Sequence, residues 1–164
     1  MTQKQTAALE KIIAALPDAY KESFREVAEY AISLGYMPAL KGGQTYVDFS
    51  KSRIGRTILK IDVNPKSPRL AMKFFAIPVY TGIFECAVTE RLAYWHKLEY
   101  EAKCFNCGKC DGTQGYTVTL PDGRQGFLCG FGMLSLPSFG EEHMVVVKEA
   151  LRIQDEFFTR QAAL

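Results

Sequence analysis

Four cysteines are spaced as ligands of one metal ion. Cys104, Cys107 and Cys110 form two successive Cys-x-x-Cys steps, and eighteen residues separate them from Cys129. A Cys-x-x-Cys step lets two thiolates bind one ion because the tight turn between them directs both sulfur atoms inward. Four thiolates complete the tetrahedral shell that zinc prefers and leave no position for water. The spacing therefore predicts one zinc ion with a structural role.

Other chemistries of these cysteines stay open. Two Cys-x-x-Cys steps in series also begin the run that binds an iron–sulfur cluster, although the closing Cys-Pro of that run is missing. If only three thiolates bind, His96 or His143 could complete the shell, or a water could occupy it and make an open catalytic site. A set of free thiols is the plainest alternative.

A strongly basic segment runs through residues 51–73, with seven Lys or Arg residues against one acid. Period-two patterning places Arg56 and Lys60 on one face of a strand, and Lys73 could join them from the next strand. Aromatic residues are expected beside these cations: Tyr46 and Phe75. Cations interleaved with aromatics are typical of a surface for an anionic ligand or a nucleic acid. An ordinary solvated sheet face is the alternative, because the net charge of the chain is only +2.

The elements that position these residues follow from apolar periodicity. Residues 3–16 and 18–34 place apolar side chains every three or four positions, which predicts two helices. Between residues 45 and 76 the apolar residues alternate instead, which predicts three strands of an antiparallel meander. Residues 81–98 return to helical spacing and lead into the cysteines.

A hairpin and a helix are expected after the cysteines. Residues 116–120 and 125–129 flank a turn that contains Pro121, Asp122 and Gly123, so the hairpin would carry Cys129 back toward the other three cysteines. A last helix follows. The predicted order is α-α-β-β-β-α-metal loop-β-β-α. We expect a single α+β domain over residues 1–164, its antiparallel sheet flanked by helices, with a four-cysteine zinc-binding insertion at about 100–132.

The composition indicates a folded protein of the cytoplasm. Hydrophobic residues make up 48% of the 164 residues, which is enough for a sizeable core. The chain contains no apolar run long enough for a membrane span or a signal peptide. An odd number of cysteines without such a signal argues against a disulfide framework. We expect a small-molecule or protein partner and no membrane association, with nucleic acid less favoured.

Part of the chain resembles a known group of domains. The segments Gly-Tyr-Met-Pro-Ala at 35–39, Lys-Gly-Gly at 41–43 and Tyr-Val-Asp-Phe at 46–49 follow a helix that begins at Leu16-Pro17. This arrangement, over roughly residues 15–77, resembles small bacterial α+β domains of uncharacterised, sometimes frataxin-like, families. The resemblance implies a helix-flanked antiparallel sheet that handles iron or a small ligand, and it transfers no site residue to this chain.

These observations favour a non-enzymatic, zinc-stabilised module that binds a ligand or regulates a partner. No phosphate-binding glycine loop, nucleophile elbow or His-Glu-x-x-His helix is present in the sequence. Three alternatives remain: an iron–sulfur or redox protein, a nucleic-acid-binding module that uses the basic sheet face, and a metalloenzyme with an open site.

Overall fold

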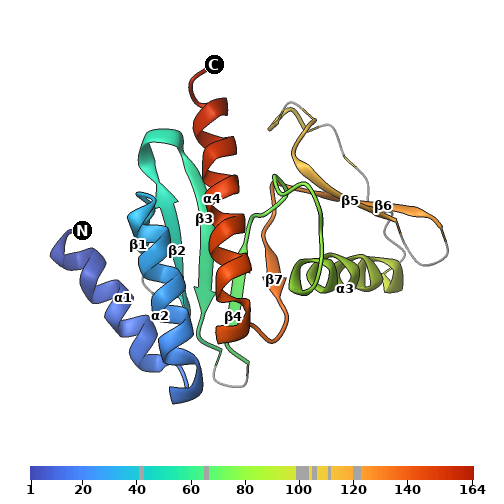
Figure 1. The fold of residues 1–164 in the computed structure, drawn as a ribbon. Helices are drawn as coiled ribbons and strands as arrows, with labels where there is room; N and C mark the ends of the chain where they lie inside the picture. Colours follow the sequence, from blue (N-terminus) through green and yellow to red (C-terminus); the bar gives the residue numbers. More distant parts are fainter. Residues whose placement is uncertain (41–42, 65–66, 99–103, 105–106, 111, 120–122) are drawn as a thin grey trace.

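The chain folds as an α+β protein. The structure, a computed structural model, describes residues 1–40, 43–64, 67–98, 104, 107–110, 112–119 and 123–164. Within them lie a five-stranded antiparallel sheet, a separate two-stranded hairpin and four α-helices (Figure 1). In chain order the elements are α1 (Gln3–Ala15), α2 (Asp18–Ser33), β1 (Met37–Ala39), β2 (Tyr46–Lys51), the short 3-10 helix η1 (Ser52–Ile54), β3 (Arg56–Asp62), β4 (Arg69–Met72), α3 (Ile83–Lys97), β5 (Gly115–Thr119), β6 (Gln125–Cys129), β7 (Leu134–Leu136), the 3-10 helix η2 (Glu141–His143) and α4 (Met144–Gln161).

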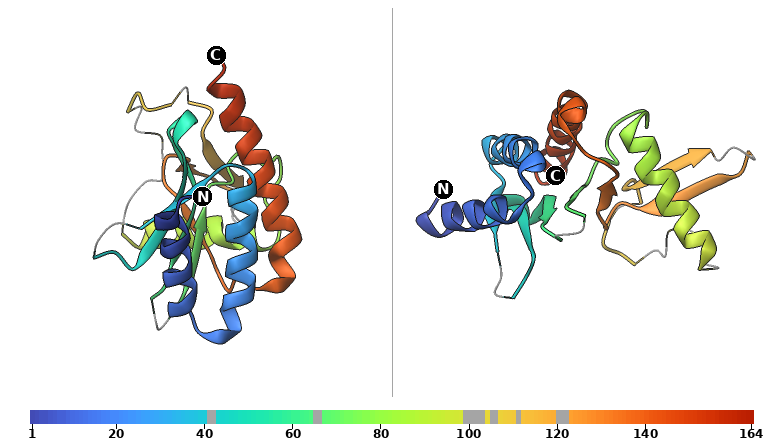
Figure 2. Two further views of the ribbon diagram at one scale, coloured as in Figure 1. Left: turned by 90° about the vertical axis from the view of Figure 1, so that its left-hand side faces the viewer. Right: turned by 90° about the horizontal axis from the view of Figure 1, so that it is seen from below.

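The main sheet has the strand order β1-β2-β3-β4-β7, with every neighbouring pair antiparallel. Helices α2 and α4 lie across one face of this sheet, and α1 packs beside α2 against β1 and β2 (Figures 1 and 2). Helix α3 and the β5–β6 hairpin lie beyond β7 at the opposite edge. The hairpin that carries Cys129 is therefore attached to the sheet through β7 and α3.

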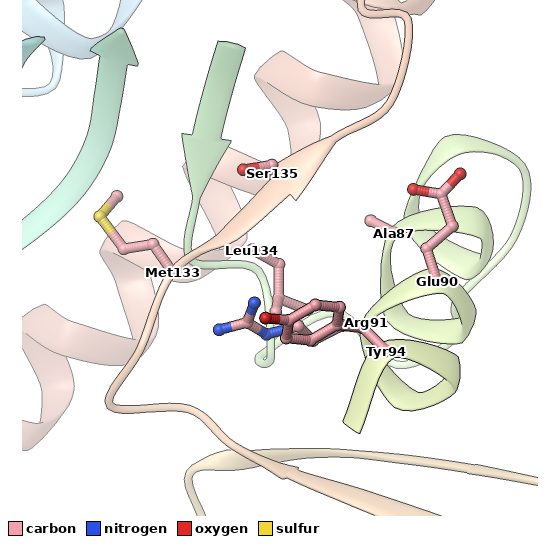
Figure 3. A pocket seen from close by; sticks show the side chains of 7 residues that line it. All are labelled: Ala87, Glu90, Arg91, Tyr94, Met133, Leu134 and Ser135. Atoms are coloured by element: carbon pink, nitrogen blue, oxygen red, sulfur yellow. The ribbon is translucent and has the colours of Figure 1, made fainter. Parts of the chain in front are cut away.

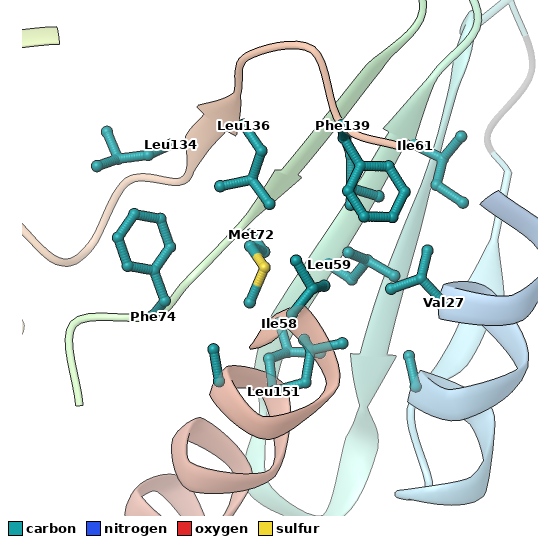
Figure 4. Packing of buried hydrophobic residues seen from close by; sticks show 14 of the residues in the cluster. Val27, Ile58, Leu59, Ile61, Met72, Phe74, Leu134, Leu136, Phe139 and Leu151 are labelled. Carbon is teal, nitrogen blue, oxygen red and sulfur yellow. The ribbon is translucent and has the colours of Figure 1, made fainter. Parts of the chain in front are cut away.

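The core lies between the sheet and the helices α2 and α4. Val27 of α2 and Leu151 of α4 meet the sheet side chains shown in Figure 4, and both are fully buried. The alternating residues of the strands supply the other side of this layer: Val47, Phe49, Leu59, Ile61, Leu70 and Met72. Each such side chain stabilises the fold by about 1.5–3 kcal/mol relative to its exposed state. Because this face of the sheet is buried, the pairing register of its strands is strongly specified.

A bulge in β3 changes which residues face α4. The pairing of β2 with β3 is regular from Tyr46 to Phe49 and then shifts by one residue, which leaves Ile58 as the extra residue. Beyond the bulge Lys51 and Arg56 are opposite each other. Lys51 Nζ reaches Asp155 Oδ1 of α4 at 2.8 Å. Arg56 shares that face and therefore also turns toward α4.

The predicted α+β class with an antiparallel sheet is confirmed. The described sheet contains two strands more than the sequence predicted. The three-residue strands β1 and β7 form the two edges of the main sheet, and neither was predicted. Segments this short show too little alternation to be recognised, and β1 contains Pro38. The hairpin forms at the predicted place but pairs only with itself.

None of the helices in the described segments has both the length and the apolar character that crossing a membrane requires.

Candidate functional site

Arg56 and Lys73 lie over the same aromatic ring. The guanidinium carbon of Arg56 is 5.8 Å from the centre of the Phe158 ring, and Lys73 Nζ is 5.9 Å from it. Phe158 belongs to the last turn of α4. Lys73 directly follows β4, and its backbone N–H donates to the carbonyl of Ile58 in the bulge at 3.0 Å. Two cations from neighbouring strands therefore converge on the end of α4.

Lys73 is buried, and the described part of the chain gives it no carboxylate partner. Only 7% of its surface is exposed. Among the residues that the structure describes, no carboxylate lies within ion-pair distance of Lys73 or Arg56. Burial lowers the pKa of Lys73 below its ordinary value, the charge of the nearby Arg56 lowers this pKa further, and the negative charge of a Cys129 thiolate opposes both effects. Buried charges in proteins are normally paired, so this lysine is an exception that requires a physical account.

An open hollow of about 300 Å³ adjoins Arg56. Its lining contains Arg56, the half-buried Cys110, Gln114, Gln161 and Leu164. The amide of Gln114 donates from Nε2 to Gln161 Oε1 at 3.0 Å, which ties the start of the hairpin to the end of α4. The hollow thus combines one planar guanidinium with neutral amide groups that can donate or accept hydrogen bonds.

Aromatic side chains form the wall behind the site. Phe75 is buried, and its ring packs edge to face on Phe157, Phe158 and Tyr116 at centroid distances of 5.3, 5.9 and 6.0 Å. The hydroxyl of Tyr116 accepts a hydrogen bond from the Phe74 amide at 3.2 Å, and burial raises the pKa of this tyrosine. Phe75 therefore holds Phe158 in place and does not face a ligand.

The other two residues predicted for the basic surface lie elsewhere. Lys60 Nζ is 3.4 Å from Asp48 Oδ1 and 3.9 Å from the centre of the Tyr46 ring, on the sheet face away from α4. The prediction that Arg56 and Lys60 share a face is wrong, because the bulge at Ile58 inverts the alternation between them. Within the described residues the predicted set thus divides into a paired cation, Lys60, and two cations without an acid, Arg56 and Lys73.

The cysteines of the predicted zinc site lie in two parts of the chain. Cys104, Cys107 and Cys110 belong to the cysteine loop, the segment between α3 and β5, and Cys129 belongs to the hairpin. Cys104 and Cys107 are exposed, whereas Cys110 and Cys129 are half-buried. Cys129 ends β6 opposite Gly115, so it returns to the same end of the hairpin as Cys110. The intervening residues 105–106 and 111 lie outside the described part of the chain. Two of the four thiols therefore border the cationic site.

The four thiols suit zinc chemically, but the described residues do not bring them together into a metal-binding group. Four thiols are the ligands that structural zinc prefers. Within the described residues, no three side chains among His, Cys, Asp and Glu gather closely enough to hold a metal ion. His96 is exposed on α3, and His143 Nδ1 accepts from the Gly140 amide at 3.3 Å. Zinc binding by the four cysteines therefore stays a prediction.

A second hollow lies between α3 and β7. Its volume is about 190 Å³, and Figure 3 shows Arg91 and Tyr94 pointing from α3 toward the segment at Leu134 and Ser135. The Arg91 guanidinium lies 5.8 Å from the Tyr94 ring and 5.5 Å from that of Trp95. Arg91 is thus already placed against aromatic rings of its own helix. Glu90 also lines this hollow, so its carboxylate offsets the charge of Arg91, and the hollow lacks the excess of positive charge found at Arg56 and Lys73.

Sequence reasoning missed several members of the site. Phe158, Gln114 and Gln161 were not singled out from the sequence. The amides could not be recognised because the residues that meet at the hollow lie at three distant places in the chain.

Comparisons with known proteins add no relative. No protein-family model, no curated protein and no solved structure matches the chain. The resemblance of residues 15–77 to frataxin-like domains is left untested by these comparisons. Any functional conclusion must rest on the chemistry of the site.

Proposed function

We propose that the chain is a non-enzymatic binding module that holds a small anionic ligand between Arg56 and Lys73. The observation that carries the proposal is the burial of Lys73 without a carboxylate partner in the described part of the chain. A buried, uncompensated ammonium destabilises a fold by several kcal/mol in principle. A bound anion would supply the missing counter-charge, and its binding would recover part of that free energy.

The geometry around Arg56 suits an anion with several oxygen atoms. The planar guanidinium can donate two parallel hydrogen bonds to a carboxylate, sulfate or phosphate group, and an ammonium beside it adds a point charge. The hollow of about 300 Å³ on Arg56 is at the small end of ligand pockets. A small molecule fits this volume. An extended nucleic-acid strand is less favoured, because Lys60 and Tyr46 lie on the far face of the sheet.

Thermal unfolding in a panel of anions tests the proposal. Acetate, sulfate, phosphate and pyrophosphate, compared at constant ionic strength, should include at least one that stabilises the wild-type protein in proportion to its concentration. Arg56→Gln should weaken binding of that anion about tenfold or more, because it removes a charge-assisted hydrogen-bond donor. Lys60→Gln is the matched control. It removes the same charge from the same strand, on the face away from α4, and should leave binding unchanged.

Two results would contradict the proposal. One is a wild-type protein that none of the four anions stabilises. The other is equal weakening by Arg56→Gln and Lys60→Gln, which would indicate a general response to net charge and no defined site.

We further propose that Cys104, Cys107, Cys110 and Cys129 hold one structural zinc ion. Support comes from the Cys-x-x-Cys spacing and from the hairpin register, which returns Cys129 to the end where Cys110 lies. Bound zinc would supply a fixed tetrahedral cross-link and no reactive water. Because Cys110 lines the hollow on Arg56, the cross-link would fix one wall of the anion site, and its four thiolates would add negative charge near Arg56 and Lys73.

Metal analysis of protein purified without added metal checks the zinc proposal. We expect near-stoichiometric zinc, no visible absorbance, and loss of the zinc in Cys129→Ser together with a lower melting temperature. Cys86→Ser is the control, because Cys86 is an exposed thiol of α3 outside the ligand set. If the protein instead contains iron and absorbs visible light, the cysteines hold an iron–sulfur cluster and not zinc. A metal-free protein, or unchanged metal content in Cys129→Ser, would contradict the ligand assignment.

A further inference from the structure

A third cation continues the site formed by Arg56 and Lys73. Lys73 Nζ lies 5.4 Å from the centre of the Phe131 ring, and Lys109 Nζ lies 4.7 Å from the same centre. Two rings are therefore shared by three cations: Arg56 and Lys73 both lie near Phe158, and Lys73 and Lys109 both lie near Phe131. The three come from β3, from the end of β4 and from the cysteine loop.

No acid in the described residues neutralises this row of charges. None of the three cations forms an ion pair there. By contrast, Lys51 on the same end of α4 pairs with Asp155, and Arg69 of β4 pairs with Asp62. Across the described segments, carboxylates thus lie beside neighbouring cations and not beside these three. Three adjacent positive charges repel one another, so a ligand with more than one negative charge is the most effective counter-ion.

We infer that the ligand is a phosphorylated small molecule that carries at least two negative charges, with Lys109 as its third contact. This inference rests on the proposed anion site and names its substrate class. A phosphate group carries about −1.5 to −2 charges at neutral pH and three acceptor oxygens. One guanidinium fork and two ammonium groups can satisfy these oxygens together, whereas a monocarboxylate would leave two cations without a counter-charge.

The surroundings favour a small molecule over a phosphate polymer. Proteins that bind single strands use a charged groove along which several exposed aromatics stack the bases. Among the described residues, the exposed aromatic side chain beside the cations is Phe131, with 49% of its surface accessible, and both lysines already lie against its ring. The hollow beside Arg56 is small and open, and the neutral amides of Gln114 and Gln161 belong to its lining. A short phosphorylated compound matches this arrangement.

Calorimetric titration with acetate, phosphate and pyrophosphate tests the inference on the full-length protein. Pyrophosphate should bind at least about tenfold more tightly than acetate, because its second and third charges meet Lys73 and Lys109. Lys109→Gln should weaken pyrophosphate about threefold to fivefold, the range for an exposed charge, and leave acetate unchanged. Lys11→Gln on α1 is the control, since it removes the same charge at the opposite edge of the sheet.

The outcomes separate the two levels of the proposal. If acetate and pyrophosphate bind equally and both need Arg56, the anion site stands and the phosphate inference is overturned. If no anion binds, both the anion site and the phosphate inference are contradicted. A single-stranded oligonucleotide that binds more tightly with each added nucleotide would overturn the small-molecule assignment in favour of a polymer. A loss of pyrophosphate affinity in Lys11→Gln as large as in Lys109→Gln would overturn the third contact.

Discussion

Lys73→Met should make the protein more stable while it removes anion binding. Lys73 is only 7% exposed and has no carboxylate partner in the described segments. Methionine has a similar length and volume and fills the space between Phe131 and Phe158 without a charge. Replacement of a buried charge by a well-packed apolar side chain stabilises proteins by about 1–4 kcal/mol. Residues that lower stability and support binding in this way are typical of functional sites.

The gain in stability should depend on pH in a defined direction. The pKa of Lys73 in the folded state is lowered, and that of an unfolded lysine is about 10.4. Between these two values the unfolded state binds more protons at this group, so the wild-type protein gains stability as the pH rises. The advantage of Lys73→Met should therefore be largest near neutral pH and shrink toward about pH 10. Both proteins contain the same other titrating groups, whose effects largely cancel in the difference.

Denaturant unfolding of both proteins from about pH 7 to about pH 10 measures this difference. Lys60→Met is the control, because Lys60 is half-exposed and paired with Asp48. It should give no comparable gain. A loss of stability in Lys73→Met, or a gain that grows with pH, would show that the lysine has a partner in the folded state and would remove the main argument for the anion site.

Asp155→Asn should cause the largest loss of stability among the polar substitutions of α4. Asp155 Oδ1 accepts a hydrogen bond from the buried Tyr36 hydroxyl at 2.9 Å and pairs with Lys51 Nζ at 2.8 Å. Tyr36 is fully buried after α2, where Gly35 adopts a φ of +92° and ends the helix. Burial and the bond to Asp155 together raise the pKa of Tyr36, so its hydroxyl stays protonated and remains a donor.

The expected loss is about 2–3 kcal/mol, the range for a hydrogen bond to a charged group whose partners remain largely buried. Equilibrium denaturation measures it, and Tyr36→Phe should reproduce part of the loss. The matched control is Glu149→Gln, an exposed carboxylate of the same helix that pairs with Arg152. It should leave the unfolding free energy unchanged within error. Equal effects of the two substitutions would mean that the contact of α2 and β2 with α4 does not depend on Asp155.

The sequence predicts much of the fold and only part of the site. Long periodic segments such as α2 were predictable, because a helix that buries Phe24, Val27 and Ala31 must repeat apolar residues every three or four positions. The short edge strands β1 and β7 could not be recognised, because their pairing is decided by tertiary contacts. Alternation also predicts nothing about a bulge, so the sequence placed Arg56 on the face of Lys60.

Arg56 and Lys73 show more clearly which features of the site the sequence could not predict. Arg56 and Lys73 were singled out from local charge, strand alternation and neighbouring aromatics, and the pattern could not distinguish them from the paired Lys60. What separates them is the position of acids and of Phe158, and both depend on how α4 packs on the sheet. For the cysteines the spacing predicts a ligand set, and the described thiols do not gather into a metal-binding group. Metal binding couples to local folding, so spacing alone indicates the capacity and not the state.

Nuclear magnetic resonance of arginine side chains during a pyrophosphate titration tests the central claim most directly. The Nε–H signal of Arg56, assigned by its absence in Arg56→Lys, should shift with saturation as the anion accepts its hydrogen bonds. In Lys73→Met the same signal should shift weakly and without saturation. If the Arg56 signal stays in place while pyrophosphate moves other arginine signals, or if Lys73→Met responds as the wild type does, the anion does not bind between Arg56 and Lys73.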